Sequence, residues 1–198
     1  MDDATQLERF KSAQQAFGAV VSQVKDTSWA DPTPCTEWDV RALVNHVAGE
    51  LFWATPMVDG KTIEEVGSAL DGDLMDEDPQ AKWTDSVKQS RLAFNTPGAL
   101  DGEINSSMGP MPVRQYLSDL TCDLITHRWD LGEAVANSQR FTSDEMEQLR
   151  TMLEQLTPMA DQLVAGGYFA AAKPVSPDAD EQTRILAAMG RGSWPDSL

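Results

Sequence analysis

The strongest constraint on the fold is a stripe of apolar side chains that recurs at three- and four-residue spacing between Pro112 and Ala136. Its members are Val113, Tyr116, Leu117, Leu120, Leu124, His127, Leu131 and Ala134. This spacing places them on one side of an α-helix, because a helix turns once in about 3.6 residues. The same spacing over residues 4–25 predicts another amphipathic helix. No segment keeps the period-two alternation of a half-buried strand, so the sequence predicts an all-α fold.

A further long helix is expected over about residues 37–57. Thr36, followed three residues later by Asp39, resembles a capping box that would begin this helix. Pro56 is expected to end it, because proline cannot donate the backbone hydrogen bond that a continuing helix needs.

The rest of the chain alternates helical patterns with loops that contain Pro and Gly. Helices are expected over about residues 81–95, 143–163 with an interruption near Pro158, and 180–189. Residues 98–111 are expected to form a loop with a short extended piece at 103–105. We expect a helical bundle over residues 1–167 and a C-terminal tail over 168–198 that packs on it.

Charge and hydropathy narrow the range of partners. The chain has 32 acidic and 15 basic residues, a net charge of −17, and no basic run that could bind a phosphate backbone. No segment approaches the roughly 18 apolar residues that a membrane span requires. The acidic start, Met1-Asp2-Asp3-Ala4, lacks the layout of a signal peptide. We therefore expect a soluble cytoplasmic protein with no nucleic-acid or membrane partner.

The two cysteines are too few for a disulfide framework. Cys122 lies within a helical pattern and is expected to act as a small apolar residue. Cys35 follows Pro34 in a loop, so it is either a similar packing residue or an exposed, reactive thiol.

The two histidines provide the clearest chemical pattern. Asp123 lies four residues before His127, so both side chains point to the same side of one helix. A buried carboxylate needs a cation, hydrogen bonds or a proton. Imidazole and carboxylate groups are common ligands of divalent metals, and His46 is the other histidine that could join them. The alternative from spacing alone is a local Asp123–His127 hydrogen bond, with His46 as a core residue.

Glu50 lies one turn after His46, and its spacing is compatible with several roles. It could be a fourth metal ligand, a base or a partner that orients a ligand. Otherwise it is a solvated glutamate on a helix face.

Two long motifs resemble those of a known family. Residues 32–46 read PTPCTEWDVRALVNH and resemble the pattern PTPC-x-x-W-x-V-x-x-L-x-x-H of the mycothiol-dependent maleylpyruvate isomerase N-terminal domain family, within the DinB-like superfamily. Residues 123–131, DLITHRWDL, resemble its D-x-x-x-H-x-W-D-L pattern. Residues 187–191, AAMGR, resemble the LLALLGR ending of a short-chain, metal-binding subfamily.

The resemblance implies a DinB-like four-helix bundle, with an additional helix and a C-terminal tail, that holds one divalent metal. Zinc is the expected metal and nickel the alternative. The motifs assign the ligands to His46, Asp123 and His127. In the isomerase the metal is thought to activate the thiolate of mycothiol, which adds to the substrate so that a double bond can rotate. The family's bundles are also often homodimers.

This chain is therefore expected to bind a divalent metal and to handle a small-molecule thiol and substrate, by isomerase or thiol-transferase chemistry. The isomerase has glutamate where this chain has Asp123, and a second C-terminal domain contributes to its site, whereas we expect only a short tail here. The other functional reading is a non-enzymatic metal-binding or regulatory module. A metal-free polar core is the third reading.

Overall fold

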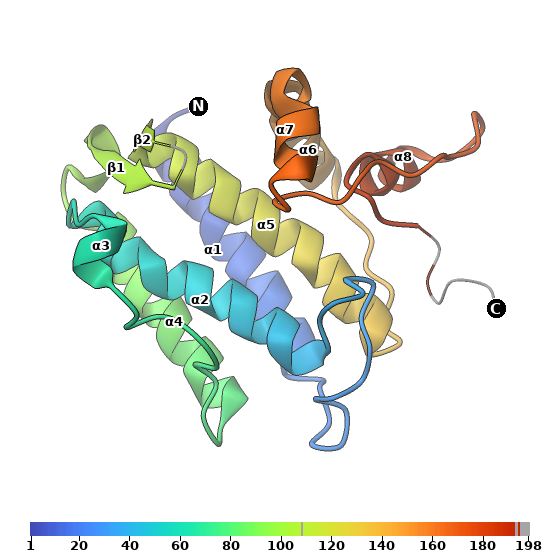
Figure 1. Ribbon diagram of the computed structural model, residues 1–198, viewed down its shortest axis with the longest axis horizontal. Coiled ribbons are helices and arrows are strands. Elements are labelled where there is room, and N and C mark those ends of the chain that lie inside the picture. The colour runs from blue at the N-terminus through green and yellow to red at the C-terminus, as the bar shows by residue number, and fades with distance from the viewer. Residues whose placement is uncertain (108, 193, 195–198) are drawn as a thin grey trace.

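The structure, a computed structural model, describes residues 1–107, 109–192 and 194. Its centre is a bundle of the helices α1 (Asp3–Val21), α2 (Val40–Val58), α4 (Pro79–Phe94) and α5 (Val113–Ala134). α2 packs against α4 and α5, and α1 packs against the same two helices, which closes the bundle (Figure 1). The all-α, four-helix expectation is thus confirmed.

The bundle closes because the predicted stripe of α5 points into it. Every stripe member except Ala134 is buried, and Leu117 and Leu131 are 0% exposed. Aromatic rings fill the space between α1 and α4, where the centroids of Phe17 and Trp83 lie 4.7 Å apart. Removing this apolar surface from water is the main favourable term in the folding of such a bundle.

The predicted start of α2 is wrong. The helix begins at Val40, and the side chain of Asp39 accepts a hydrogen bond from the backbone N–H of Ala42 at 2.8 Å. Asp39 is therefore the N-cap, and residues 32–38 form a loop whose ends are joined by a bridge between Pro32 and Asp39. Within this loop the Thr33 hydroxyl donates to the carbonyl of Trp38 at 2.8 Å.

The predicted end of α2 near residue 57 agrees with the structure, in which the helix ends at Val58, but Pro56 lies inside the helix and does not stop it. Pro56 lies in the last turn, so its missing N–H removes a single helical hydrogen bond. Backbone bonds from Gly60 and Lys61 to the carbonyls of Met57 and Pro56 then complete the helix end.

A small hairpin precedes α5. Its strands β1 (Glu103–Ser106) and β2 (Gly109–Pro112) pair antiparallel. Earlier in the chain lie the short helix α3 (Ile63–Val66), between α2 and α4, and the 3-10 turn η1 (Ala99–Asp101), directly before β1. The expected extended piece at 103–105 is present, but its pairing was not anticipated. The strands are too short to show a period-two pattern, and Ile104 is the buried residue of β1.

The C-terminal part contains α6 (Ser143–Leu156), the 3-10 turn η2 (Thr157–Met159), α7 (Ala160–Ala165) and α8 (Glu181–Ala188). α6 packs on α5 and α8, while α7 projects away from the bundle (Figure 1). The interruption expected near Pro158 is present as η2. Leu149, Ile185 and Met189 belong to the main hydrophobic core. The division of the chain at residue 167 stays a prediction.

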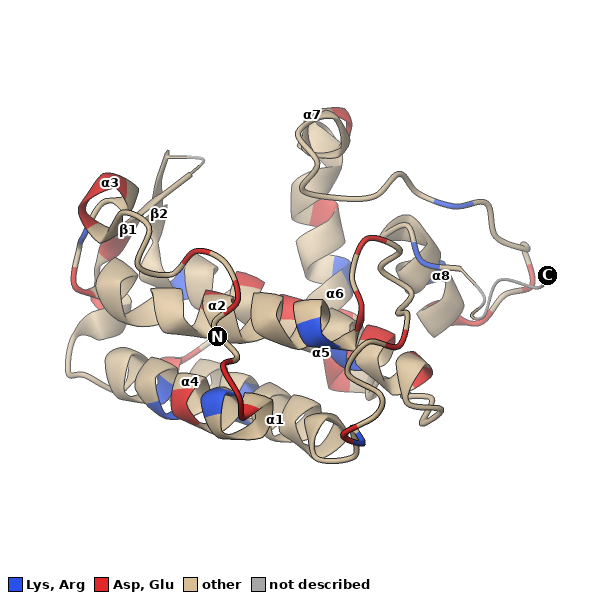
Figure 2. Ribbon diagram, turned by 60° about the horizontal axis from the view of Figure 1, so that its bottom comes forward, with Lys and Arg blue, Asp and Glu red and all other residues tan. Residues whose placement is uncertain are grey.

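Acidic residues are spread along helices and loops alike (Figure 2). Within the described part of the chain, no helix has both the length and the apolar character needed to cross a membrane. Cytoplasmic location and the lack of nucleic-acid binding stay predictions.

The helix start can be tested with two alanine substitutions. We expect Asp39→Ala to lower the free energy of unfolding by about 1 kcal/mol, because it removes the N-cap of α2. Thr36→Ala changes an exposed side chain outside the helix and should cost less than about 0.5 kcal/mol. Urea denaturation followed by circular dichroism measures both. A greater loss for Thr36→Ala would contradict the assigned start.

Candidate metal centre

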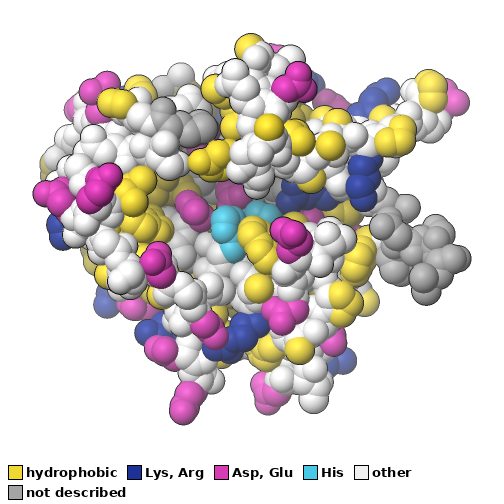
Figure 3. Space-filling view, viewed as in Figure 1, with side chains coloured by type: hydrophobic (Ala, Val, Ile, Leu, Met, Phe, Trp, Pro, Cys, Tyr) yellow, Lys and Arg dark blue, Asp and Glu magenta, His cyan; other side chains and the backbone are white. Residues whose placement is uncertain are grey.

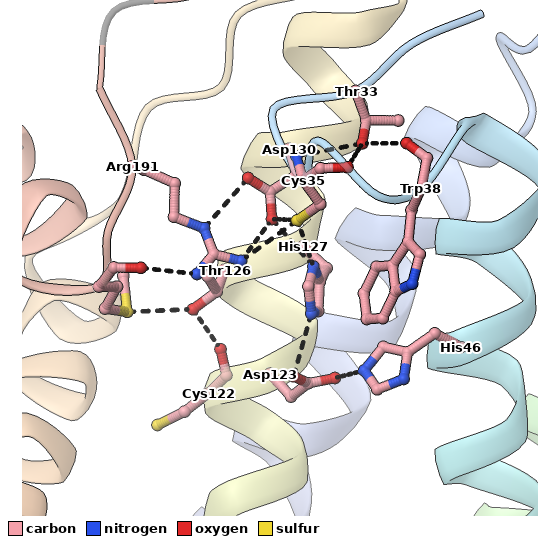
Figure 4. A network of polar contacts seen from close by, with 11 residues as sticks. Thr33, Cys35, Trp38, His46, Cys122, Asp123, Thr126, His127, Asp130 and Arg191 are labelled. Atoms are coloured by element: carbon pink, nitrogen blue, oxygen red, sulfur yellow. Dashed lines mark hydrogen bonds and ion pairs between the residues drawn. The ribbon is translucent and has the colours of Figure 1, made fainter. Parts of the chain in front are cut away.

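The three residues assigned by the motifs lie together, between α2 and α5 (Figure 4). His46 comes from the middle of α2, and Asp123 and His127 come from successive turns of α5. Their ligand atoms all lie within 4.8 Å of one another. Among the described residues, no fourth His, Cys, Asp or Glu belongs to this group.

The spacing of these atoms suits a shared ion better than direct hydrogen bonds. Asp123 Oδ1 lies 3.3 Å from His127 Nε2, and Asp123 Oδ2 lies 3.6 Å from His46 Nε2. Two ligands at about 2.1 Å from a tetrahedral zinc ion are about 3.4 Å apart. A hydrogen bond between an imidazolium and a carboxylate is shorter, about 2.8 Å.

Asp123 is a carboxylate whose two oxygens face the two imidazoles at more than the usual hydrogen-bond distance. Its Oδ2 is buried and has no hydrogen-bond partner among the described residues. Burial would raise the pKa of this carboxyl group, but the two imidazoles lower it below its usual range. Burial would likewise lower the pKa of His127, but the carboxylates of Asp123 and Asp130 raise it well above its usual value. The site therefore favours positive charge, which a proton or a metal ion can supply.

Asp130 contacts the other nitrogen of the same imidazole. Its Oδ2 lies 2.9 Å from His127 Nδ1, a normal hydrogen-bond distance. A carboxylate that accepts from Nδ1–H leaves Nε2 as the nitrogen with a free lone pair, facing Asp123. Such a partner is typical of metal-binding histidines. Sequence reasoning did not assign this role to Asp130, although its position three residues after His127 places it on the same side of α5.

Asp130 is also the meeting point of two other segments. Its side chain is 0% exposed, and it accepts hydrogen bonds from the guanidinium of Arg191 at 2.8 and 3.2 Å. The thiol of Cys35 donates to Asp130 Oδ2 at 3.2 Å. Burial alone would raise the pKa of Asp130, but the His127 hydrogen bond and the charge of Arg191 lower it to about 2.

Cys35 is therefore neither a fully exposed thiol nor a purely apolar residue. It is half-buried, its Sγ lies 3.9 Å from His127 Nδ1, and it could form a second ligand group with His127 and Asp130. The guanidinium of Arg191 contacts this Sγ at 3.5 Å and already pairs with Asp130. A positive charge in that place opposes the binding of a second cation.

The indole of Trp38 covers the histidines from the loop that precedes α2. Its ring centroid lies 4.5 Å from that of His46 and 5.6 Å from that of His127. The centre remains open on another side, since the side chains of His46 and Asp123 are 29% and 32% exposed. In the space-filling view the histidines lie in a hollow beside acidic and basic side chains (Figure 3).

Glu50 is near the centre but is not one of the grouped ligand atoms. It is half-buried, which does not fit a freely solvated glutamate. Burial raises its pKa, and the negative charge of Asp123 adds to this rise. Its role as a ligand or a base stays a prediction.

Two other titratable groups on α5, Cys122 and Asp119, face a different region. Burial raises the pKa of Cys122 to about 12, in line with the expected packing role. Burial also raises the pKa of Asp119 to about 6. Both residues line a cavity of about 350 Å³ between α1, α5 and α6 that contains neither histidine.

Comparison with known proteins relates the chain to one family. Residues 10–132 match the family described as "Mycothiol maleylpyruvate isomerase N-terminal domain". Uncharacterised proteins from two strains of Mycobacterium tuberculosis are each 29% identical to the chain over 133 residues. These alignments cover 64% of this chain but 65% of each relative, just under two thirds of its length.

A solved structure shares the fold. The crystal structure of a histidine-to-alanine variant of a mycothiol-dependent maleylpyruvate isomerase aligns with a TM-score of 0.63 at 16% identity, over 79% of this chain and 70% of that chain. The family match confirms the resemblance inferred from the motifs, and His46, Asp123 and His127 all lie within the matched residues.

Asp130 provides a test of the site's electrostatics without added metal. We expect Asp130→Asn to lower the free energy of unfolding by about 3 kcal/mol, because it leaves Arg191 without its carboxylate partner. Asp26→Asn, at an exposed position, should cost less than about 0.5 kcal/mol. Urea denaturation of the metal-free proteins measures both.

The loss of stability in Asp130→Asn is also expected to depend on pH. The pKa of Asp130 is about 2 in the folded chain, against a usual value of 3.8. The stability that its ionised form provides is therefore present above about pH 4 and is lost as the pH falls toward 2. The difference between wild type and Asp130→Asn should shrink over that window. An equal difference at about pH 6 and about pH 3 would contradict the assignment.

Proposed function

Because the chain belongs to the mycothiol maleylpyruvate isomerase N-terminal domain family, we propose that it binds one divalent metal ion through His46, Asp123 and His127 and handles a low-molecular-weight thiol there. Zinc is the metal that this set of two imidazoles and a carboxylate fits best, with nickel as the alternative. Mycothiol is the proposed thiol, because the family and its solved relative are named for it.

The observation that carries the metal proposal is the buried Oδ2 of Asp123, which has no hydrogen-bond partner in the described part of the chain and lies 3.6 Å from His46 Nε2. Leaving such an atom unpaired is costly, and a cation between Asp123 and the two imidazoles would remove that cost. The separations of 3.3 and 3.6 Å leave room for such an ion.

The number of ligands supports a reactive centre rather than a closed structural one. Structural zinc sites have four protein ligands, whereas catalytic sites keep a position open for water or substrate. Three protein ligands and the partial exposure of His46 and Asp123 fit the open type. The alternative, a structural or sensing module, requires a fourth protein ligand, and Glu50 is the nearby carboxylate that could supply it.

The protein's own side chains would divide the work at such a centre. When bound, a divalent ion lowers the pKa of a thiol that it holds, which yields a thiolate at neutral pH. Asp130 holds His127 in the orientation that points Nε2 toward Asp123. Trp38 covers one side of the two imidazoles and limits the approach of water there. Isomerisation and thiol transfer are the two reaction types proposed, and homodimer formation stays a prediction.

Metal binding is tested by ligand substitutions. We expect the wild type to bind about one zinc ion per chain and His127→Ala to bind it more than about 100-fold more weakly, because a first ligand is lost. Asp119→Asn is the matched control, since it removes another partly buried carboxylate of α5 outside the group. Equilibrium dialysis with elemental analysis gives the affinities. Equal affinity of wild type and His127→Ala would contradict the assignment.

Thiol binding is tested separately with cobalt in place of zinc. Mycothiol added to the cobalt-loaded wild type should produce a thiolate-to-cobalt charge-transfer absorption, because a thiolate would enter the open position. An analogue with a hydroxyl in place of the thiol is the control and should produce none. If mycothiol gives no change in protein with verified cobalt content, the thiol part of the proposal is wrong.

A further inference from the structure

We propose that Arg191, in the segment that follows α8, is a positioning residue of the candidate metal centre. Arg191 fixes the carboxylate of Asp130, and Asp130 fixes the imidazole of His127. This inference rests on the proposed function. Arg191 lies outside residues 10–132, which match the family, so the family match does not assign it a role.

The contact between Arg191 and Asp130 uses both carboxylate oxygens. Nη2 of Arg191 donates to Oδ2 at 2.8 Å, and Nε donates to Oδ1 at 3.2 Å. A planar guanidinium that binds both oxygens sets the rotation of the carboxylate plane, which a single point charge does not. The side chain of Asp130 is 0% exposed, so water does not replace this partner.

The fixed carboxylate acts directly on a proposed metal ligand. The oxygen that accepts from Arg191 Nη2 is the one that lies 2.9 Å from His127 Nδ1. The direction of His127 Nε2 therefore depends on where Asp130 Oδ2 lies. Outer partners of this kind affect metal affinity without touching the ion.

The segment that carries Arg191 is itself held in place. The backbone N–H of Arg191 donates to the carbonyl of Leu186 at 2.8 Å, and its Nη1 donates to the carbonyl of Met189 at 2.9 Å. Met189 is 1% exposed in the core, where the Thr126 hydroxyl lies 3.6 Å from its sulfur. Core packing thus presents the guanidinium to Asp130. Figure 4 shows the resulting contact between Arg191 and Asp130.

The main experiment measures zinc affinity by competition with a chromophoric chelator. Arg191→Met should bind zinc about 10- to 100-fold more weakly than wild type. Arg191→Lys, which keeps the charge but loses the planar fork, should fall between the two. Arg140→Met is the matched control: it breaks the surface pair with Asp180 before α8 but does not touch Asp130. Its affinity should equal that of wild type.

A double-substitution cycle separates positioning from a general structural role. If Arg191 acts through Asp130, then Arg191→Met should cause little further loss of zinc affinity in an Asp130→Asn background. Fully additive losses would overturn the proposal. So would an unchanged affinity in Arg191→Met, or an equal loss in Arg140→Met. If Arg191→Met does not fold, unchanged affinity in Arg191→Lys overturns the proposal and a loss supports it.

Hydrogen exchange of the metal-free chain distinguishes failure of this inference from failure of the proposed function. Asp130→Asn should speed amide exchange in residues 186–192, because it releases the Arg191 side chain. Arg140→Met should speed amide exchange in residues 186–192 less than Asp130→Asn does. If the wild type binds no zinc, the proposed function fails and the metal role of Arg191 fails with it. If zinc binds but exchange does not change in Asp130→Asn, the Arg191 inference alone is overturned.

Discussion

A buried carboxylate joins three parts of this protein that are distant in sequence. Asp130 is inaccessible to solvent, and its charge is compensated by His127 on the same helix, Cys35 in the loop before α2, and Arg191 after α8. A buried charge is tolerated only when such partners are in place. The loop, the central helix and the C-terminal segment must therefore take up their positions together around this group.

The candidate metal centre depends on the same arrangement from the other side of the His127 ring. Nδ1 faces Asp130 at a hydrogen-bond distance, whereas Nε2 faces Asp123 at a longer one. The N-cap at Asp39 begins α2 and so sets the turn on which His46 meets them. The ring is thus held by a satisfied contact and left available at the nitrogen that the proposed ion requires.

The helices and part of the candidate metal centre could be predicted from the spacing of residues along the sequence. Periodicity locates the helices because burial of an apolar face repeats with the helical turn, and it pairs Asp123 with His127 one turn apart. His46 joins them only through the family motif, since nothing local says that α2 faces α5 at that turn. The start of α2 was misplaced because Thr36 and Asp39 are both good caps, and the loop bridge that decides between them is a tertiary feature.

The contacts of Asp130 could be predicted only in part from the sequence. Its proximity to His127 follows from helix geometry, but Arg191 reaches it through the packing of Met189 and Leu186 into the core. The AAMGR motif singles out Arg191 in the sequence, but neither the motif nor the helical periodicity indicates that its side chain contacts Asp130. The two hairpin strands are likewise too short for their pairing to be predicted from the sequence.

The placement of the proposed ligands on α2 and α5 has a topological consequence. These helices are joined by a long stretch of chain that includes α3, α4 and the hairpin. An ion bound to His46, Asp123 and His127 would tie the two ends of that stretch together, as a cross-link does. An unfolded chain offers no such preformed set of ligands, so the binding energy would add to the stability of the fold. The amount of folded protein would then follow the supply of the metal.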